Sequence, residues 1–183
     1  VSANGVLLMS IGFVAGQDAP VLWRGPLLGQ AIRQFTDQVA WGELDYLIVD
    51  LPPGTGDIPL SLSQSIALSG AIIVTTPQSV ALEDVQRGIA MFSKVEVDIL
   101  GVVENMSFYD CVECGKRHEI FGSGGARQIA EKFGITFLGN LPLSTSLRKA
   151  GDTGSPLTVS EYESALFSNL ANCIVDSLKG LTD

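Results

Sequence analysis

Short apolar runs alternate with amphipathic stretches along almost the whole chain. Periodicity predicts strands at 5–14, 45–50, 71–75, 99–103 and 135–138. It predicts helices at 26–39, 59–68, 82–92, 126–133 and 161–178, and the last of these carries an apolar stripe on which Cys173 is expected to be a core residue. Continuous apolar strands that alternate with helices are typical of an α/β fold, with a mostly parallel sheet and helices on both faces.

Composition narrows the class of protein. The chain has 183 residues, 46% of them hydrophobic, and we expect one domain that spans 1–183. The apolar content excludes a disordered chain, and three cysteines are too few for a disulfide scaffold. A net charge of -9 argues against a nucleic-acid partner. No run approaches the about 18 apolar residues of a membrane helix, so we expect no membrane partner.

The chain begins with Val1 and runs at once into an apolar segment without a basic leader. We therefore expect either a removed leader or the C-terminal part of a longer chain. The absence of an export signal predicts a cytoplasmic protein, or an organelle matrix if a targeting segment was lost.

Asp50 ends an apolar run and opens a segment rich in proline and glycine. Ligands of open α/β sheets bind at the carboxyl ends of the strands, where a carboxylate can hold Mg²⁺ through water and glycines let a phosphate approach. The alternative is that Asp50 caps a turn and the segment is a connector.

The phosphate loop G-x-x-x-x-G-K-[S/T] does not occur. The glycine-rich stretch 122–125 opens a helix, either as a weak anion site or as a flexible turn.

Cys111 and Cys114 form a C-x-x-C pair in a segment, at about 106–122, that we expect to be irregular. Zinc and thiolate-bound clusters usually take four ligands, so a symmetric dimer would complete the site. His118 is close in sequence, but no spacing supports it as a third ligand, and we expect a solvated loop histidine. A thioredoxin-like redox role is disfavoured, because the pair does not begin a helix after an early strand.

These motifs together resemble the C-terminal three-quarters of the Mrp (ApbC) family of P-loop ATPases, which belong to the MinD/ParA-like superfamily and act as iron–sulfur cluster carriers. A mitochondrial relative that assists respiratory complex I looks equally close. The segments that carry the resemblance follow the family's order along almost the full chain, and they are 9–13, 23–26, 45–57, 76–78, 104–107, 111–115, 120–122 and 139–143.

The resemblance implies an ATP-dependent homodimer that binds a [4Fe–4S] cluster and transfers it to apo-proteins. Cys111 and Cys114 match the pair that bridges the cluster between two subunits through the C-x-x-C loop. Asn105 matches the residue that reads the adenine edge, although the bare sequence favours a turn-capping asparagine. The Mg²⁺ and phosphate side of the ATP site matches Asp50, Gly54, Thr55, Gly56 and Asp57.

The resemblance also implies that the family's phosphate loop and first strand precede Val1. Without them we expect this polypeptide to bind ATP weakly, and ATP hydrolysis to belong to the full-length parent; in a eukaryote the location would be the mitochondrial matrix. Two alternatives stay open. One is a non-catalytic dimer bridged by structural zinc. The other is a MinD-type spatial-regulator ATPase, which the single base Lys179 near the end of the last helix disfavours.

Overall fold

A computed structural model describes residues 1–15, 25–51, 57–156 and 159–181. The chain forms two compact units, Val1–Ala67 and Leu68–Asp183, and each is described by itself. Among the described residues, no helix is both long enough and apolar enough to cross a membrane.

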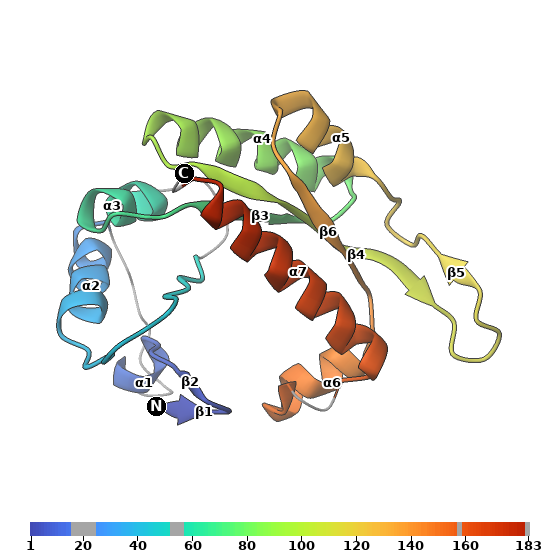
Figure 1. The fold of residues 1–183 in the computed structure, drawn as a ribbon, viewed down its shortest axis with the longest axis horizontal. Coiled ribbons are helices and arrows are strands. Elements are labelled where there is room, and N and C mark those ends of the chain that lie inside the picture. Colours follow the sequence, from blue (N-terminus) through green and yellow to red (C-terminus); the bar gives the residue numbers. More distant parts are fainter. Residues whose placement is uncertain (16–24, 52–56, 157–158, 182–183) are drawn as a thin grey trace. The chain divides into compact units, whose positions relative to one another are not determined.

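Over 1–15, 25–51 and 57–67, the first unit forms a small hairpin and three helices (Figure 1). Strands β1 (Ser2–Ala3) and β2 (Val6–Leu7) pair antiparallel, and the helices are α1 (Gly12–Ala15), α2 (Gly25–Asp37) and α3 (Asp57–Ser65). The predicted strand over 5–14 is therefore wrong. Asn4 and Gly5 both adopt positive φ, 50° and 79°, which favours a two-residue hairpin turn at the point where the strand was expected to begin.

The predicted buried strand over 45–50 is also wrong in this structure. The segment has no regular secondary structure, and its apolar side chains are exposed, Ile48 to 87%. A strand needs a neighbour that satisfies its backbone N–H and C=O groups. In the described part of the first unit, β1 and β2 pair only with each other, so the segment finds no partner.

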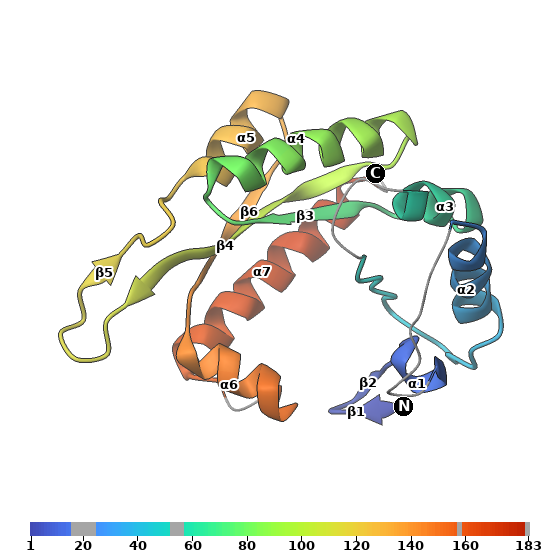
Figure 2. The same cartoon turned by 180° about the vertical axis from the view of Figure 1, so that it is seen from behind.

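The second unit is built on a mostly parallel sheet. The sheet places β4 (Ile99–Asp110) between β3 (Ala71–Thr75) and β6 (Phe137–Pro142), parallel to both. Helices α4 (Ser79–Lys94) and α5 (Gly125–Phe133) cover one face, and α7 (Glu161–Lys179) crosses the other (Figures 1 and 2). The predicted fold class, a mostly parallel sheet with helices on both faces, is confirmed.

The core of this unit is centred on β4, where Val102 and Val103 are at most 2% exposed. The continuous apolar pattern of the strand arises because both of its faces are covered. Helices α4 and α5 bury one apolar stripe each against it, including Val85, Ile89, Phe92, Ala126 and Ile129.

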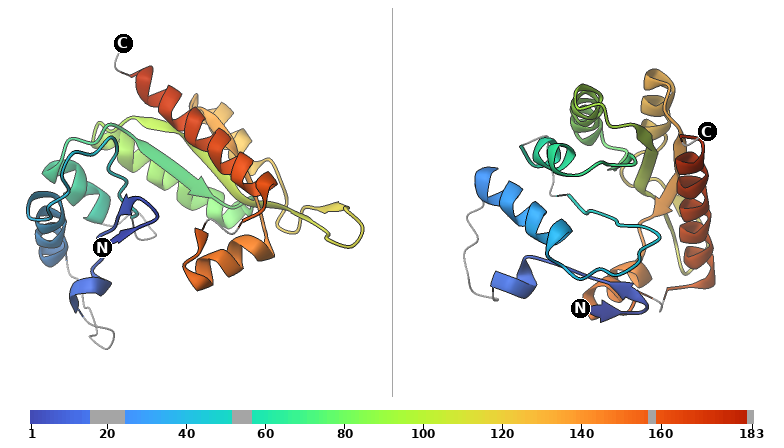
Figure 3. Two further views of the ribbon diagram at one scale, coloured as in Figure 1. Left: turned by 60° about the horizontal axis from the view of Figure 1, so that its bottom comes forward. Right: turned by 60° about the vertical axis from the view of Figure 1, so that its left-hand side comes forward.

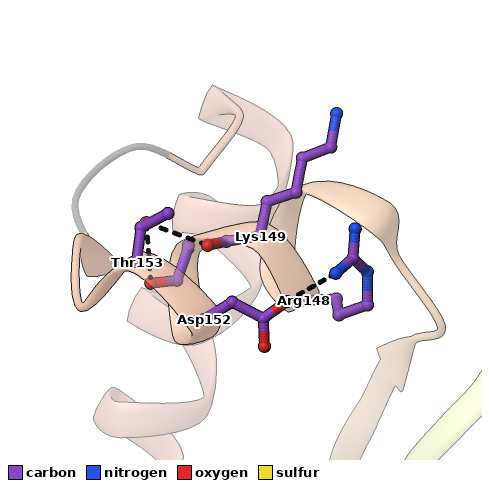
Figure 4. Close-up of polar contacts among 5 residues, drawn as sticks. Arg148, Lys149, Asp152 and Thr153 are labelled. Atoms are coloured by element: carbon purple, nitrogen blue, oxygen red, sulfur yellow. Dashed lines mark hydrogen bonds and ion pairs between the residues drawn. The ribbon is translucent and has the colours of Figure 1, made fainter.

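One helix of the second unit escaped the sequence prediction. Helix α6 (Thr145–Thr153) is short and polar, and it has only two apolar side chains, Leu147 and Ala150, too few to mark a helix in the sequence. Its ends are nevertheless well defined, because the Ser144 hydroxyl accepts hydrogen bonds from two backbone N–H groups at the start. Along its exposed side, Arg148 pairs with Asp152 and the Thr153 hydroxyl donates to the Lys149 carbonyl oxygen (Figure 4).

The start of α7 is fixed by a buried carboxylate. Ser160 and Glu163 form a capping box, and both carboxylate oxygens of Glu163 also accept from the Ser146 hydroxyl at 2.6 Å. Burial alone would raise the pKa of Glu163, but hydrogen bonds from Ser144, Ser146 and Ser160 outweigh it and lower the pKa to about 2. This one side chain therefore ties α6 to α7.

Cys173 is exposed on α7, so its prediction as a core residue is wrong. The half-buried positions of the helix are those that repeat every four residues, such as Leu170 and Ile174. Cys173 lies next to that stripe, and the narrow contact of α7 with β4 and β6 leaves it in solvent.

Candidate functional site

The cysteine pair lies at the tip of a hairpin in the second unit. Strand β4 continues to Asp110, turns through 111–116, and returns as β5 (Arg117–His118), antiparallel to its own end. The expected irregular segment of about 106–122 is thus partly regular, because β4 is seven residues longer than the predicted strand, which ended at 103. The hairpin extends beyond helices α6 and α7 in the left view of Figure 3.

Backbone hydrogen bonds shape the turn that carries the thiols. The Gly115 N–H donates to the Cys111 carbonyl oxygen at 2.8 Å, and the Cys111 N–H donates to the Lys116 carbonyl oxygen at 3.0 Å. Gly115 adopts φ 69°, a left-handed conformation that glycine reaches without steric cost. The glycine that directly follows the second cysteine therefore lets the chain fold back and bring the two cysteines together.

Both thiols are free and accessible, with Cys111 half-buried and Cys114 exposed. Backbone hydrogen bonds from Cys114, then from Glu113, lower the pKa of the Cys111 thiol, and the side chain of Cys114 adds to this effect. The thiolate is the form of cysteine that binds a metal ion. The loop therefore favours the ligating form of one of its two sulfurs.

The pair offers two ligands and no more. In the part of the chain that the structure describes, no group of three or more His, Cys, Asp or Glu residues lies close enough to hold a metal ion. His118 is exposed, as expected for a solvated histidine, but it lies in β5, where it pairs with Tyr109, and not in a loop. A tetrahedral site or a four-thiolate cluster would need ligands from a second molecule.

A buried glutamate closes the base of the cysteine segment. Glu104 is 1% exposed; its Oε1 accepts from the Ser107 hydroxyl at 2.6 Å and from the Gly124 N–H at 3.0 Å, and its Oε2 accepts from the Ala126 N–H at 2.8 Å. The carboxylate thus joins the start of the segment to its end, about twenty residues later. We name Glu104, Ser107, Gly124 and Ala126 the glutamate clamp.

The clamp also decides how the glycine-rich stretch 122–125 is used. Gly124 and Ala126 at the start of α5 direct N–H groups to a carboxylate, as expected where a helix N-terminus attracts negative charge. A Cβ added to Gly125 would lie 2.5 Å from Leu82 Cδ1. The stretch is therefore an internal anion site packed against α4, and the anion is the protein's own Glu104.

The role of Glu104 was not predicted from the sequence. A carboxylate within a continuous apolar strand was the available signal, because a buried charge requires hydrogen-bond partners. The glycine-rich helix start near residue 124 supplies them.

The residues expected at the nucleotide lie in both units. Asp50 is exposed, in the first unit, and Asp57 begins α3 in the same unit. Gly54, Thr55 and Gly56 lie outside the described residues. Asn105 lies in β4 of the second unit, and its Oδ1 accepts from the Met106 N–H at 2.9 Å, while Met106 adopts φ 55°. The Asn105 side chain stabilises an irregular strand residue, the kind of local role that the bare sequence favours.

Similarity to known proteins agrees with the cysteine pair and the fold. A family model described as ParA, NUBPL iron-transfer P-loop NTPase, matches residues 1–178. The chain is 47% identical over 177 residues to the iron–sulfur cluster transfer protein NUBPL of Dictyostelium discoideum, covering 97% of this chain and 55% of that protein. It is 45% identical over 181 residues to the iron–sulfur cluster carrier protein of Escherichia coli K12, covering 97% of this chain and 49% of that protein.

Solved structures support the same fold. A nucleotide-binding protein of Archaeoglobus fulgidus in complex with ADP superimposes with a TM-score of 0.66 at 43% identity, covering 75% of this chain and 55% of that one. The cell division ATPase MinD of Pyrococcus furiosus gives a TM-score of 0.58 at 20% identity, covering 84% of this chain and 59% of that one, and shows the fold alone.

The chain spans about half the length of the curated relatives it matches. The match still covers nearly all of its own residues and includes both cysteines of the hairpin. This chain therefore belongs to the NUBPL family of iron-transfer P-loop NTPases.

Proposed function

We propose that this chain carries a [4Fe–4S] cluster as a homodimer and transfers it to apo-proteins, with Cys111 and Cys114 of each copy supplying the four thiolate ligands. The exposed pair at the hairpin tip is the observation that carries this proposal. Two thiolates are half of a cluster's ligand set, and a two-fold axis beside the tip would complete it. Accessible ligands also suit a cluster that must leave for an acceptor.

Anaerobic reconstitution with iron and sulfide tests this proposal. We expect about one [4Fe–4S] per two chains, a count set by four thiolate ligands. The Cys111→Ala/Cys114→Ala variant should bind no cluster. Cys173→Ala is the matched control, because it removes an exposed cysteine outside the hairpin and should bind iron like the wild type. A full cluster on the double variant would contradict the assignment, and zinc without sulfide would favour the zinc-bridged dimer.

ATP and Mg²⁺ regulate this carrier in our proposal. Asp50 supports Mg²⁺, the segment Gly54–Asp57 responds to the γ-phosphate, and Asn105 binds the adenine. The family match to P-loop NTPases and the ADP complex of the Archaeoglobus fulgidus protein support this part. We place the protein in the cytoplasm, or in the mitochondrial matrix if it is eukaryotic, as mitochondrial relatives such as that of Arabidopsis thaliana suggest.

The nucleotide part is tested on a protein of full family length, because the phosphate loop does not occur within these 183 residues. We expect slow Mg²⁺-dependent ATP hydrolysis that falls in Asp50→Asn, since an amide holds Mg²⁺ and its waters less strongly than a carboxylate. Asp45→Asn, five residues earlier in the same segment, is the control. Unchanged turnover in Asp50→Asn would remove Asp50 from the metal site.

A further inference from the structure

The stem below the two thiols is unusually short. Strands β4 and β5 share two residue pairs, Tyr109 with His118 and Asp110 with Arg117. A two-stranded hairpin of this length is not stable by itself in water. Side-chain contacts must therefore fix the direction in which the tip points.

Arg117 makes those contacts on one face of the stem. Its Nε and Nη2 donate to the two carboxylate oxygens of Asp110, each at 2.8 Å, and its Cζ lies 3.6 Å from the centre of the Phe108 ring. Strand geometry explains the cluster, because residues 108 and 110 share a face and Arg117 is directly opposite one of them. A bidentate pair and a stacked guanidinium both restrict orientation more than a single hydrogen bond does.

This cluster connects the tip to the core. Phe108 is 4% exposed, so the ring under the guanidinium belongs to the packed interior. The hydrogen bond with Asp110 raises the pKa of Arg117; partial burial opposes this rise, and a hydrogen bond with Tyr162 near the start of α7 adds to it. Arg117, on β5, thus contacts the packed interior through β4.

The Asp110–Arg117 ion pair also flanks the two cysteines in the sequence. Asp110 directly precedes Cys111, and Arg117 is the third residue after Cys114. The pair therefore closes the six-residue loop that contains both thiols. We propose that Arg117 is the positioning residue of the cysteine pair: it fixes the loop against the sheet, so that both sulfurs face a second copy in one orientation. This inference rests on the proposed cluster function.

Two measurements test it on the whole chain, with Arg117→Ala, Arg117→Lys and the control Arg87→Ala. Arg87 pairs with Asp84 at 2.7 Å on the exposed side of α4, so the control removes an arginine and an ion pair far from the cysteines in sequence. In Arg117→Ala we expect hydrogen exchange of the Cys111 and Gly115 amides to accelerate about tenfold, with β3 amides unchanged. At limiting iron, cluster per chain should fall about threefold, because fewer loops present both thiols together.

Arg117→Lys should give exchange rates and cluster content between those of the wild type and Arg117→Ala, since an ammonium keeps the charge but cannot form the bidentate contact. Arg87→Ala should match the wild type in both measurements. Unchanged exchange at the hairpin in Arg117→Ala would overturn the proposal, and so would faster exchange with undiminished cluster. Faster exchange in β3 as well would also overturn it, since the effect would then be general unfolding. A wild-type chain without iron would refute the proposed function instead, while the exchange arm would still report on the stem.

Discussion

The base and the tip of the cysteine segment are built in opposite ways. At the base, the glutamate clamp places a 1% exposed carboxylate against one hydroxyl and two backbone N–H groups. At the tip, two backbone hydrogen bonds shape a loop in which Cys114 is exposed and Val112 is 85% exposed. Stability is therefore concentrated at one end of the segment and accessible chemistry at the other.

This division matters because regions with few buried contacts open at low free-energy cost, whereas buried networks open only with the whole unit. A loop that must release a cluster benefits from the first property. The element that carries the loop needs the second. Substitutions at the base should then lower the free energy of unfolding of the whole second unit, and substitutions at the tip should change iron binding with effects on stability confined to the hairpin.

The largest effect is expected at the base. Glu104→Ala leaves the Gly124 and Ala126 N–H groups without an acceptor and opens a cavity under β4. We expect the free energy of unfolding of the second unit to fall by about 4 kcal/mol. Hydrogen exchange of β4 amides measures this directly, because both tryptophans, Trp23 and Trp41, lie in the first unit and tryptophan fluorescence would report the wrong region.

Glu104→Gln is the matched variant for this prediction. Its amide keeps one acceptor oxygen but turns an N–H toward a backbone donor, so about 2 kcal/mol should be lost. Equal and small losses in both variants would mean that the carboxylate contributes nothing beyond its volume, and the contrast between base and tip would fail.

A second buried carboxylate, Glu163, stabilises the same unit through hydrogen bonds with Ser146 and Ser160, outside the hairpin. The pKa of Glu163 is lowered from 4.5 to about 2, so its hydrogen bonds favour the folded state while it is charged. This contribution, about 3 kcal/mol, is present above the unfolded pKa and is lost as the pH falls from about 5 to 2. Urea titrations followed by circular dichroism at several pH values measure the slope of the free energy of unfolding against pH.

Glu163→Gln should flatten that slope, whereas Glu161→Gln, which changes an exposed glutamate of the same first turn, should preserve it. Iron binding at neutral pH should be the same in all three chains. A loss of cluster in Glu163→Gln at full folding would show that the hairpin depends on α6 and α7 more than the comparison implies.

In the second unit, the sequence predicted those strands and helices whose apolar residues follow a regular period. The strand at 71–75 was predicted with its observed bounds, and the last helix ended within one residue of its prediction. Segment 45–50 shows the limit: its apolar pattern is that of a buried strand, but pairing depends on residues distant in the sequence, and none of the described strands pairs with it. Helix α6 was missed because capping by Ser144 defines it more than any apolar stripe.

The candidate site divides in the same way. The spacing of Cys111 and Cys114 predicted a paired ligand, because two cysteines three positions apart in a turn are close in almost any conformation. A carboxylate within an apolar strand signals that Glu104 needs hydrogen-bond partners, but the sequence does not name them, because the Gly124 and Ala126 N–H groups are about twenty residues away and reach it only when α5 packs on the sheet. The sequence therefore predicts ligands that are neighbours in the chain, but it does not predict hydrogen bonds between distant residues.

A smaller effect is expected where the tip folds back. Gly115 has φ 69° with open space around its Cα, so Gly115→Ala adds strain without a clash. The cost should be about 1 kcal/mol, confined to the hairpin. Gly88→Ala in α4 is a control of opposite sign, since it also meets open space but lies within a helix, where alanine should stabilise by about 0.5 kcal/mol. Exchange at the Cys111 amide should rise only in Gly115→Ala.

The smallest effect on stability should accompany the largest effect on chemistry. Cys111→Ala/Cys114→Ala removes one half-buried and one exposed thiol outside the core, so the free energy of unfolding of the cluster-free chain should change by less than about 0.5 kcal/mol. Urea unfolding under anaerobic, iron-free conditions measures this, with Cys173→Ala as the reference for losing an exposed thiol. A fall in the free energy of unfolding of more than about 1 kcal/mol would mean that the thiols stabilise the fold, as the buried contacts of the glutamate clamp do. A near-zero change, together with the loss of iron, would show that this segment keeps its ligands apart from the contacts that maintain its fold.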